Sequence, residues 1–352
     1  MSREDKLRVG ITMGDVAGIG PEIIIKTFMD DRIFKHCTPI LFGNPKVIGY
    51  YRRVLNIDDI KYSTIKDFNH LAHNSLNISL VWEDEIDIQP GQPNETTGKF
   101  ALQSLEAAVK AMKDGHIDVI VTAPINKKVM QQEHFNYPGH TQYLQEAFER
   151  KESLMFMVSE KLKVALVTDH VPLHEVKGQI NKEVILKKLQ LMDESLRVDF
   201  GVERPRIAVL GLNPHVGDNG LLGKEEEEII LPAITEAKKN NILVTGPYAS
   251  DGFFGACRHL AFDGVLAMYH DQGLIPFKFI AGEDGVNYTA GLPAVRTSPD
   301  HGTAEDIAGK GKASPSSFIN AIFTAIDIYN TQKAYTEMHA NPIQKHKLKD
   351  ER

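Results

Sequence analysis

Cysteine is scarce in this sequence, which argues against two kinds of protein. Only two cysteines occur among the 352 residues, Cys37 and Cys257, and they stand far apart in the chain. A disulfide framework and a cysteine zinc site both need more thiols at closer spacing. The scarcity fits a reducing compartment, so we expect a cytoplasmic protein without disulfides.

The sequence also lacks long apolar runs and an excess of positive charge. The apolar stretch after the charged N-terminus is interrupted by Gly10, Gly14 and Asp15, which argues against a signal peptide. No run approaches the roughly 20 apolar residues that a membrane span needs. The formal net charge of −7 argues against general nucleic-acid binding, although it leaves room for a local basic pocket. We therefore expect neither a membrane nor a nucleic acid as a partner.

Short apolar runs alternate with helical patterns along most of the chain. The composition is globular, and 352 residues suffice for two domains at roughly 100–200 residues each. Strand, helix and strand at this spacing are typical of an α/β fold with a largely parallel sheet. The polar stretch 332–352 is expected to be a frayed helical tail. We predict strands at 7–13, 117–122, 163–168, 206–212, 242–245 and 264–268, and helices at 21–29, 99–113, 182–196 and 225–240.

Three of these predicted strands are followed by a histidine. His170, His215 and His270 stand just beyond the carboxyl ends of the third, fourth and sixth strands. Ligands of α/β proteins bind at this edge of the sheet. Three neutral imidazoles gathered there would form an open metal site, with a position left for substrate or water. The alternative is three unconnected loop histidines, because sequence spacing cannot show that they meet in space.

The turn 137–141 has the composition of an anion-binding site. We expect Thr141 to cap a helix that begins near Gln142, because a threonine side chain accepts hydrogen bonds from free backbone N–H groups. The hydroxyl of Thr141, the imidazole of His140 and those N–H groups can together hold an anion. Simple helix capping explains the same residues equally well.

Basic and amide side chains recur in an otherwise apolar or small segment, at Lys278, Asn287 and Arg296. Lysine offers a point charge to phosphate, and arginine offers a planar fork to phosphate or carboxylate. Isolated basic residues are usually solvated, so this set becomes a ligand site only if it lies near the histidine loops. Asp271 and Asp251 are candidates for proton transfer or for orienting a ligand, and either is equally well explained as a turn residue.

Two glycine-rich segments are candidate ligand loops. Residues 14–21 join a strand to a helix but match neither the dinucleotide nor the phosphate-loop pattern, so a tight turn and a ligand role both stay open. Residues 301–311 combine small side chains with an acidic pair, which would let the loop approach a flat ligand and accept hydrogen bonds from a ribose. The candidate cofactor contacts in this loop are His301, Gly302, Thr303 and Asp306.

Long motifs carry a family resemblance that covers residues 8–330. They are ITMGDVAGIGPE (11–22), TAPINK (122–127), YPGHT (137–141), GLNPHVGDNGLLGKEE (211–226), AMYHDQGLIPFK (267–278) and VNYTAGLPAVRTSPDHGTAEDIAGKGKA (286–313). With these motifs the sequence resembles the PdxA family, the 4-hydroxythreonine-4-phosphate dehydrogenases of pyridoxal-phosphate biosynthesis. Its loop 301–311 is also similar to the adenine-binding loop of isopropylmalate and isocitrate dehydrogenases.

The resemblance implies a fold and an assembly. The fold would have two α/β/α domains of the isocitrate/isopropylmalate dehydrogenase-like type, with the active site in the cleft between them. Residues 1–130 and 300–352 would form an NAD-binding domain, and residues 131–299 would bind metal and substrate and form the dimer. The protein would be a homodimer whose metal sites are shared between the subunits.

Motif matches also imply roles for individual residues. His170, His215 and His270 would bind a divalent cation, either zinc, magnesium, manganese or cobalt. NAD, or else NADP, would accept hydride from C3 of 4-phosphooxy-L-threonine, and the resulting keto acid would lose CO₂. Asp271 or a metal-linked water would be the general base. The family's substrate-binding positions are matched by His140, Thr141, Lys278, Asn287 and Arg296.

Two departures from the family pattern bear on the substrate. Val16 stands where many members have proline, and Leu221-Leu222 replaces a His-Met pair shortly after His215. Relatives that oxidise 4-phospho-D-threonate or 4-phospho-erythronate share the fold and the histidines, so such a dehydrogenase is the alternative. A ligand sensor on the same fold, which would bind without forming NADH, is a second alternative.

Overall fold

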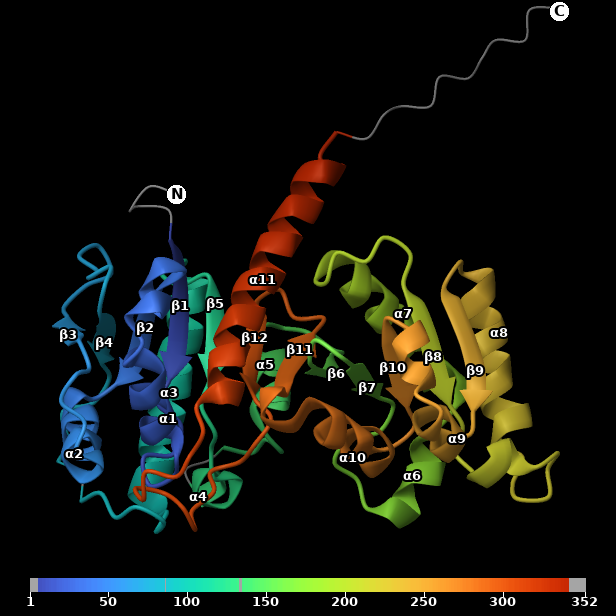
Figure 1. Ribbon diagram of the computed structural model, residues 1–352, viewed down its shortest axis with the longest axis horizontal. Helices are drawn as coiled ribbons and strands as arrows, with labels where there is room; N and C mark the ends of the chain where they lie inside the picture. Colours follow the sequence, from blue (N-terminus) through green and yellow to red (C-terminus); the bar gives the residue numbers. More distant parts are fainter. Residues whose placement is uncertain (1–5, 86, 133–134, 342–352) are drawn as a thin grey trace, which may run out of the picture.

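One mixed sheet forms the frame of the molecule. The computed structural model describes residues 6–85, 87–132 and 135–341. Its strands are β1 (Leu7–Thr12), β2 (Cys37–Gly43), β3 (Tyr62–Ile65), β4 (Leu76–Leu80), β5 (Val119–Thr122), β6 (Leu154–Val158), β7 (Lys163–Leu166), β8 (Arg206–Leu210), β9 (Leu243–Tyr248), β10 (Gly264–Ala267), β11 (Val286–Ala290) and β12 (Val295–Pro299). They follow the order β3-β4-β2-β1-β5-β12-β11-β6-β7-β10-β8-β9 (Figure 1).

Helices surround this sheet, so the expected α/β class is confirmed. They are α1 (Gly20–Phe28), α2 (Pro45–Leu55), α3 (Glu95–Lys113), α4 (Lys127–Gln132), α5 (His140–Ala147), α6 (Leu173–Gln179), α7 (Lys182–Val198), α8 (Leu231–Lys239), α9 (Ser250–Gly255), α10 (His270–Ala281) and α11 (Ser316–His339). The long helix α11 packs on β12, β5 and β11, at the middle of the sheet order (Figure 1).

The sheet changes strand direction near its centre. The strands β3, β4, β2, β1, β5 and β12 run parallel, as do β7, β10, β8 and β9 at the other end. Between the two groups, β11 pairs antiparallel with both β12 and β6, and β6 pairs antiparallel with β7. The central strands therefore join two parallel groups, which form two lobes in Figure 1.

Local sequence explains where several elements lie. Every residue of β5 (VIVT) and β10 (GVLA) is buried, as expected for parallel strands covered on both faces, and both therefore read as bare apolar runs. Asn94 caps α3 by accepting a hydrogen bond from the N–H of Thr97 at 3.1 Å. Asn181 does the same for α7 through the N–H of Val184 at 2.9 Å.

The start of α5 differs from the expected one. α5 begins at His140, Gly139 occupies the N-cap position, and no side chain caps the helix. Gly139 is extended there, with φ 173°, so the chain enters the helix before Thr141 is reached. The expectation that Thr141 is the cap is therefore wrong, because Thr141 is already a helical residue.

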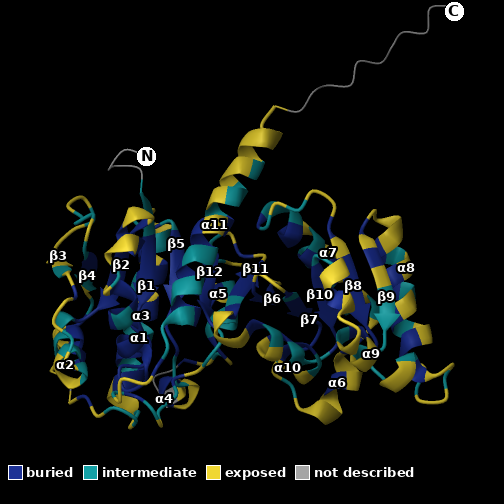
Figure 2. Ribbon diagram, viewed as in Figure 1, coloured by how far each residue is buried: buried dark blue, intermediate teal, exposed yellow. Residues whose placement is uncertain are grey.

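The predicted C-terminal helical tail is confirmed as far as helix α11 extends. The helix continues into the polar stretch as far as His339, and Figure 2 shows its last turns exposed beyond the sheet. The rest of the predicted tail, residues 342–352, lies outside the described residues. Neither α11 nor any other helix in the described ranges has the length and apolar character needed to cross a membrane.

A buried carboxylate ties α7, β11 and α11 together. Asp199, just after α7, is 6% exposed and accepts a hydrogen bond from the hydroxyl of Tyr288 at 2.8 Å. Gln332 of α11 donates to its other oxygen at 2.7 Å. Burial raises the pKa of Asp199, and the hydrogen bonds that it accepts oppose this rise. The network holds α11 against the central strands, which carry the candidate site.

Candidate functional site

A cavity of about 280 Å³ lies over the central strands, where the two lobes meet. Residues from β5, β6, β11 and β12 line it, together with residues of α5 and α10 and of the loops after β7 and β12. Most of the residues predicted from the sequence therefore lie together. Those that line the cavity are His140, Thr141, His170, His270, Lys278, Asn287, Arg296, His301 and Gly302.

The other predicted residues do not line this cavity; they are His215, Asp251, Asp271, Thr303 and Asp306. His215 follows β8, and β8 is the neighbour of β10. The loop that carries His215 therefore leaves the sheet at the expected edge. The residue lies in the 3₁₀ turn Pro214–Gly217, where His215 and Val216 have φ values of 51° and 59°. This turn does not bring the imidazole to the cavity within one chain.

Two of the three predicted metal ligands face each other. The rings of His170 and His270 lie 5.7 Å apart between centroids, because their strands β7 and β10 are neighbours. Nδ1 of His270 lies 2.8 Å from Oδ1 of Asp271, and Nδ1 of His170 lies 3.8 Å from Oδ2 of Asp169. The contact with Asp271 is short enough to orient the imidazole of His270 and to leave its Nε2 for a cation.

No complete metal centre is present in the described part of this one chain. Over those residues, no three side chains of histidine, cysteine, aspartate or glutamate gather closely enough to hold a metal ion. The described chain thus brings His170 and His270 together, without His215. The imidazole and backbone N–H of His170 also lower the pKa of Asp169 to about 2, so this carboxylate is ionised beside the pair.

Arg296 places a buried positive charge at the other end of the cavity. The residue is 3% exposed, and its guanidinium donates to the hydroxyls of Thr122 at 2.6 Å and Thr289 at 3.1 Å. No carboxylate in the described ranges pairs with it, and burial lowers its pKa to about 9. A buried cation without a counter-charge is costly, so this arrangement suits a bound anion.

Unpartnered polar atoms around the same cavity point to a ligand. Nε2 of His140, Oδ1 of Asn287 and Nε2 of His301 are buried and have no hydrogen-bond partner among the described residues. Such atoms are rare in folded proteins and are usually satisfied by a ligand or water. Burial, with Arg296 and Lys127 nearby, lowers the pKa of His140 well below its usual value, so this ring is a neutral hydrogen-bond partner.

Lys278 reaches the cavity from α10. Its Nζ donates to the carbonyl of Asp300 at 3.0 Å and lies 3.9 Å from Oδ2 of the same residue. Its side chain is half exposed, so the charge of Lys278 is only partly neutralised and stays available to a ligand. We call the part of the cavity that carries Arg296 and Lys278 its basic end. Because α10 also carries His270 at its start, this one helix contributes to both the imidazole pair and the basic end.

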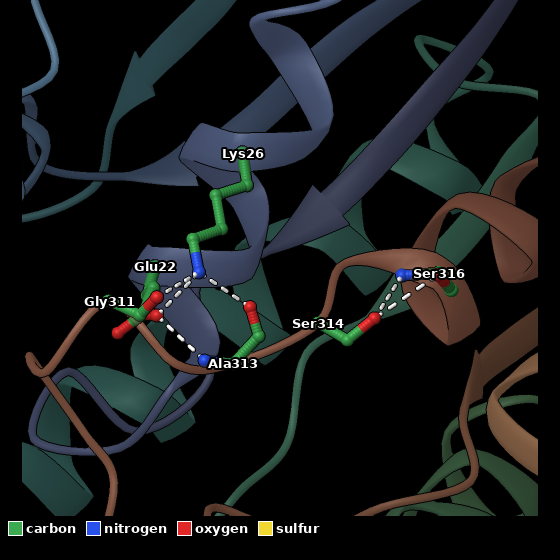
Figure 3. Close-up of polar contacts among 6 residues, drawn as sticks. All are labelled: Glu22, Lys26, Gly311, Ala313, Ser314 and Ser316. Carbon is green, nitrogen blue, oxygen red and sulfur yellow. Dashed lines mark hydrogen bonds and ion pairs between the residues drawn. The ribbon is translucent and has the colours of Figure 1, made fainter.

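The loop after β12 is fastened to α1 by a lysine (Figure 3). Nζ of Lys26 donates to the carbonyls of Gly311 at 2.9 Å and Ala313 at 2.6 Å, and it lies 2.8 Å from Oε1 of Glu22. The same oxygen of the buried Glu22 accepts the N–H of Ala313 at 2.9 Å. This clamp holds the far end of the loop whose first residues, His301 and Gly302, line the cavity.

The glycine-rich segment 14–21 packs against the loop after β12 and does not line the cavity. The N–H of Ile19 donates to the carbonyl of Thr303 at 3.0 Å. A β-carbon at Gly18 would lie 3.0 Å from the side chain of Thr303, so a larger residue would push the loop away. These contacts agree with the tight-turn interpretation of the segment, and the ligand role stays a prediction.

Sequence reasoning missed other residues that line the cavity: Thr122, Lys127, Asp169 and Asp300. Lys127 and Asp169 stand shortly after β5 and β7, at the same sheet edge that singled out the histidines. Their position just after a strand could therefore have identified them. Lysine and aspartate are so common in loops, however, that only the histidines stood out.

The chain is similar to proteins of one described family. A family model described as pyridoxal phosphate biosynthetic protein PdxA matches residues 35–325. A relative from Bacteroides thetaiotaomicron, named 4-hydroxythreonine-4-phosphate dehydrogenase, is 49% identical over 343 residues, covering 97% of this chain and 94% of the relative. A relative from Oceanobacillus iheyensis, provisionally named D-threonate 4-phosphate dehydrogenase, is 41% identical and covers 92% of this chain and 98% of its own.

A solved structure shows the same fold. The crystal structure of a 4-hydroxythreonine-4-phosphate dehydrogenase from Klebsiella pneumoniae superposes with a TM-score of 0.81 at 35% sequence identity. The match covers 92% of this chain and 98% of that one, so it includes both lobes and the cavity between them.

Replacing Lys26 by methionine should loosen the loop that it clamps. We expect backbone amides of residues 301–313 to exchange hydrogen about tenfold faster, because a hydrogen bond to a charged group contributes roughly 1.5–3 kcal/mol. Hydrogen exchange followed by mass spectrometry measures this. Lys35→Met is the matched control, since Lys35 is exposed. Equal exchange of this loop in both variants would contradict the clamp.

Replacing Arg296 by methionine should separate stability from anion binding. We expect the free energy of unfolding to stay level or rise by about 1 kcal/mol, because an unpaired buried charge is removed. Affinity for inorganic phosphate should fall at the same time. Urea unfolding and calorimetric titration measure the two quantities. A large loss of stability would show that the charge is already compensated within the fold.

Proposed function

We propose a specific reaction for this chain, which belongs to the PdxA family of pyridoxal phosphate biosynthetic proteins. It oxidises the C3 hydroxyl of 4-phosphooxy-L-threonine with NAD⁺, giving 2-amino-3-oxo-4-phosphooxybutanoate, NADH and a proton. This β-keto acid then loses CO₂ and takes up a proton to give 3-amino-2-oxopropyl phosphate. The observation that carries the proposal is the single cavity that joins an imidazole pair to an unneutralised basic end.

The basic end suits the two anionic groups of this substrate. Arg296 and Lys278 supply positive charge to its phosphate and carboxylate. His140, Thr141 and Asn287 supply polar atoms between them, two of which have no protein partner. Held at its ends in this way, the substrate presents C3 toward His170 and His270, and fixing it there lowers the entropic part of the barrier.

The imidazole pair fits a divalent cation, either zinc, magnesium, manganese or cobalt. His270 has the carboxylate of Asp271 at hydrogen-bond distance from Nδ1, which orients the ring and leaves Nε2 available. The carboxylate of Asp169 lies near Nδ1 of His170, at 3.8 Å. When bound, such a cation would act as a Lewis acid that lowers the pKa of the C3 hydroxyl. Asp271, which lies at Nδ1 of His270, or else a metal-linked water is the proposed general base.

The position of His215, the third predicted metal ligand, is the reason to propose a homodimer with shared sites. His215 does not reach the cavity of its own chain, so it serves the cavity of a second copy. The apolar side chains of Leu221, Ile275 and Phe279 are 78%, 66% and 90% exposed in the single chain. Exposed apolar groups of this size are what a subunit interface would cover.

The loop after β12 is the proposed cofactor site. A β-carbon at Gly302 would contact nothing within 4 Å, so there is room for the flat adenine ring of the cofactor to approach the backbone there. Asp306 is exposed and available to accept hydrogen bonds from a ribose. His301 and Thr303 complete the proposed contacts, with NAD⁺ as the acceptor and NADP⁺ as the alternative.

The family resemblance is also the basis for assigning cofactor binding and substrate binding to different parts of the chain. Residues 1–130 and 300–352 bind the cofactor, and residues 131–299 bind metal and substrate and form the dimer. Cys37 and Cys257 are both free thiols, which suits the cytoplasm as the place of the reaction.

The substrate decides between this enzyme and its rival, a 4-phospho-D-threonate or 4-phospho-erythronate dehydrogenase. The two substrate types differ in whether C2 carries an amino group or a hydroxyl. Purified protein with a divalent cation and NAD⁺ should form NADH from 4-phosphooxy-L-threonine with a kcat/KM that exceeds that for 4-phospho-D-threonate by about 100-fold or more. Absorbance at the nicotinamide band measures both rates. Preference for the hydroxy acid would establish the rival, and ligand binding without NADH would indicate a sensor.

Replacing His215 by alanine should remove metal retention and turnover while leaving the melting temperature nearly unchanged. His174→Ala is the matched control, since His174 is an exposed imidazole on α6. A shared site makes a further prediction: mixing His215→Ala with His270→Ala subunits should restore about a quarter of wild-type activity, because random pairing gives half heterodimers with one intact site each. Absence of any restoration would place all three ligands in one chain.

A further inference from the structure

Lys127 is a cavity residue that neither the predicted metal site nor the predicted substrate positions include. It begins α4, just after β5, and it lines the cavity with His140 and Arg296. A β-carbon built on Gly139 would lie 3.6 Å from Nζ of Lys127, so the ammonium group lies over this glycine and beside α5. The side chain is exposed, which means that an incoming anion can reach it.

The charges that line the cavity do not balance. Three permanent cations, Lys127, Lys278 and Arg296, face two carboxylates, Asp169 and Asp300. Oδ2 of Asp300 lies 3.9 Å from Nζ of Lys278, and Asp169 lies beside His170 at the imidazole end. Within the described ranges no carboxylate pairs with Lys127 or with Arg296. Two neighbouring cations thus share one region without a counter-charge.

A dianion fits this region better than a monoanion. One carboxylate brings one negative charge, whereas a phosphate monoester carries roughly 1.5 to 2 negative charges at neutral pH and three acceptor oxygens. The neighbouring His140 has an unpartnered Nε2 and adds a neutral hydrogen-bonding group. Lysine acts on phosphate as a point charge and arginine as a fork, so the two side chains complement each other.

We propose that Lys127, together with Arg296 and His140, binds the phosphate of the substrate and makes the enzyme select phosphorylated over unphosphorylated substrate. This inference rests on the proposed function and deepens it, because it assigns the phosphate to the β5 side of the cavity. The substrate then lies with its phosphate near α5 and with its C3 toward His170 and His270.

The test compares Lys127→Met with Lys128→Met in the full-length protein. Lys128 is the matched control, because it is the next residue of α4, is exposed and does not line the cavity. We expect Lys127→Met to weaken inorganic phosphate binding by about 10- to 100-fold, the usual effect of losing a hydrogen bond to a charged group. Calorimetric titration measures this binding without any turnover. Lys127→Arg should recover most of it, and an unchanged melting temperature excludes a folding defect.

Kinetics supply the second readout. We expect Lys127→Met to lose most of the preference for 4-phosphooxy-L-threonine over 4-hydroxy-L-threonine, while KM for NAD⁺ stays within about twofold of wild type. Unchanged phosphate affinity, or an equal loss in Lys128→Met, would overturn the inference. A selective rise in KM for NAD⁺ would also overturn it, because it would place Lys127 against the cofactor. If wild-type protein forms no NADH, the proposed reaction fails, and the phosphate titration still decides the role of Lys127.

Discussion

The buried charge of Arg296 is the constraint on which the rest of the site depends. Its guanidinium is held by hydroxyls of Thr122 on β5 and Thr289 on β11, so it ties together strands at the point where the sheet changes direction. A cation kept out of water without a carboxylate is unfavourable by itself. The fold tolerates it where α11 and the central strands are cross-linked by polar contacts, and a bound anion would supply the missing charge.

Those parts of the site that depend on strand ends could be predicted from the sequence. Bare apolar runs located β5, β7, β8 and β10, and the rule that ligands gather at carboxyl edges singled out the histidines after them. His170 and His270 meet because β7 and β10 are neighbours. The basic and amide side chains of Lys278, Asn287 and Arg296 were also candidates from residue type alone, and the resemblance to a known family gave them a substrate-binding role; all three line the cavity.

Other parts depend on contacts that no local pattern contains. The turn around His215 has positive φ values and keeps the ring out of its own cavity, so its place depends on turn geometry and on assembly. The clamp between Lys26 and the carbonyl of Gly311 joins residues far apart in the chain, and only the folded structure shows it. Lys127 had the right position but a common residue type, and the cap expected at Thr141 moved because extended Gly139 lets the helix start earlier.

The central claim is that the imidazole pair and the basic end hold one ligand between them. A crystal structure of the protein with a divalent cation and 4-phosphooxy-L-threonine tests it most directly, with the metal located by anomalous scattering. The account predicts the cation at Nε2 of His170 and His270, the phosphate on Arg296, and C3 between them. A phosphate bound away from Arg296, or a cation that contacts neither imidazole, would contradict it.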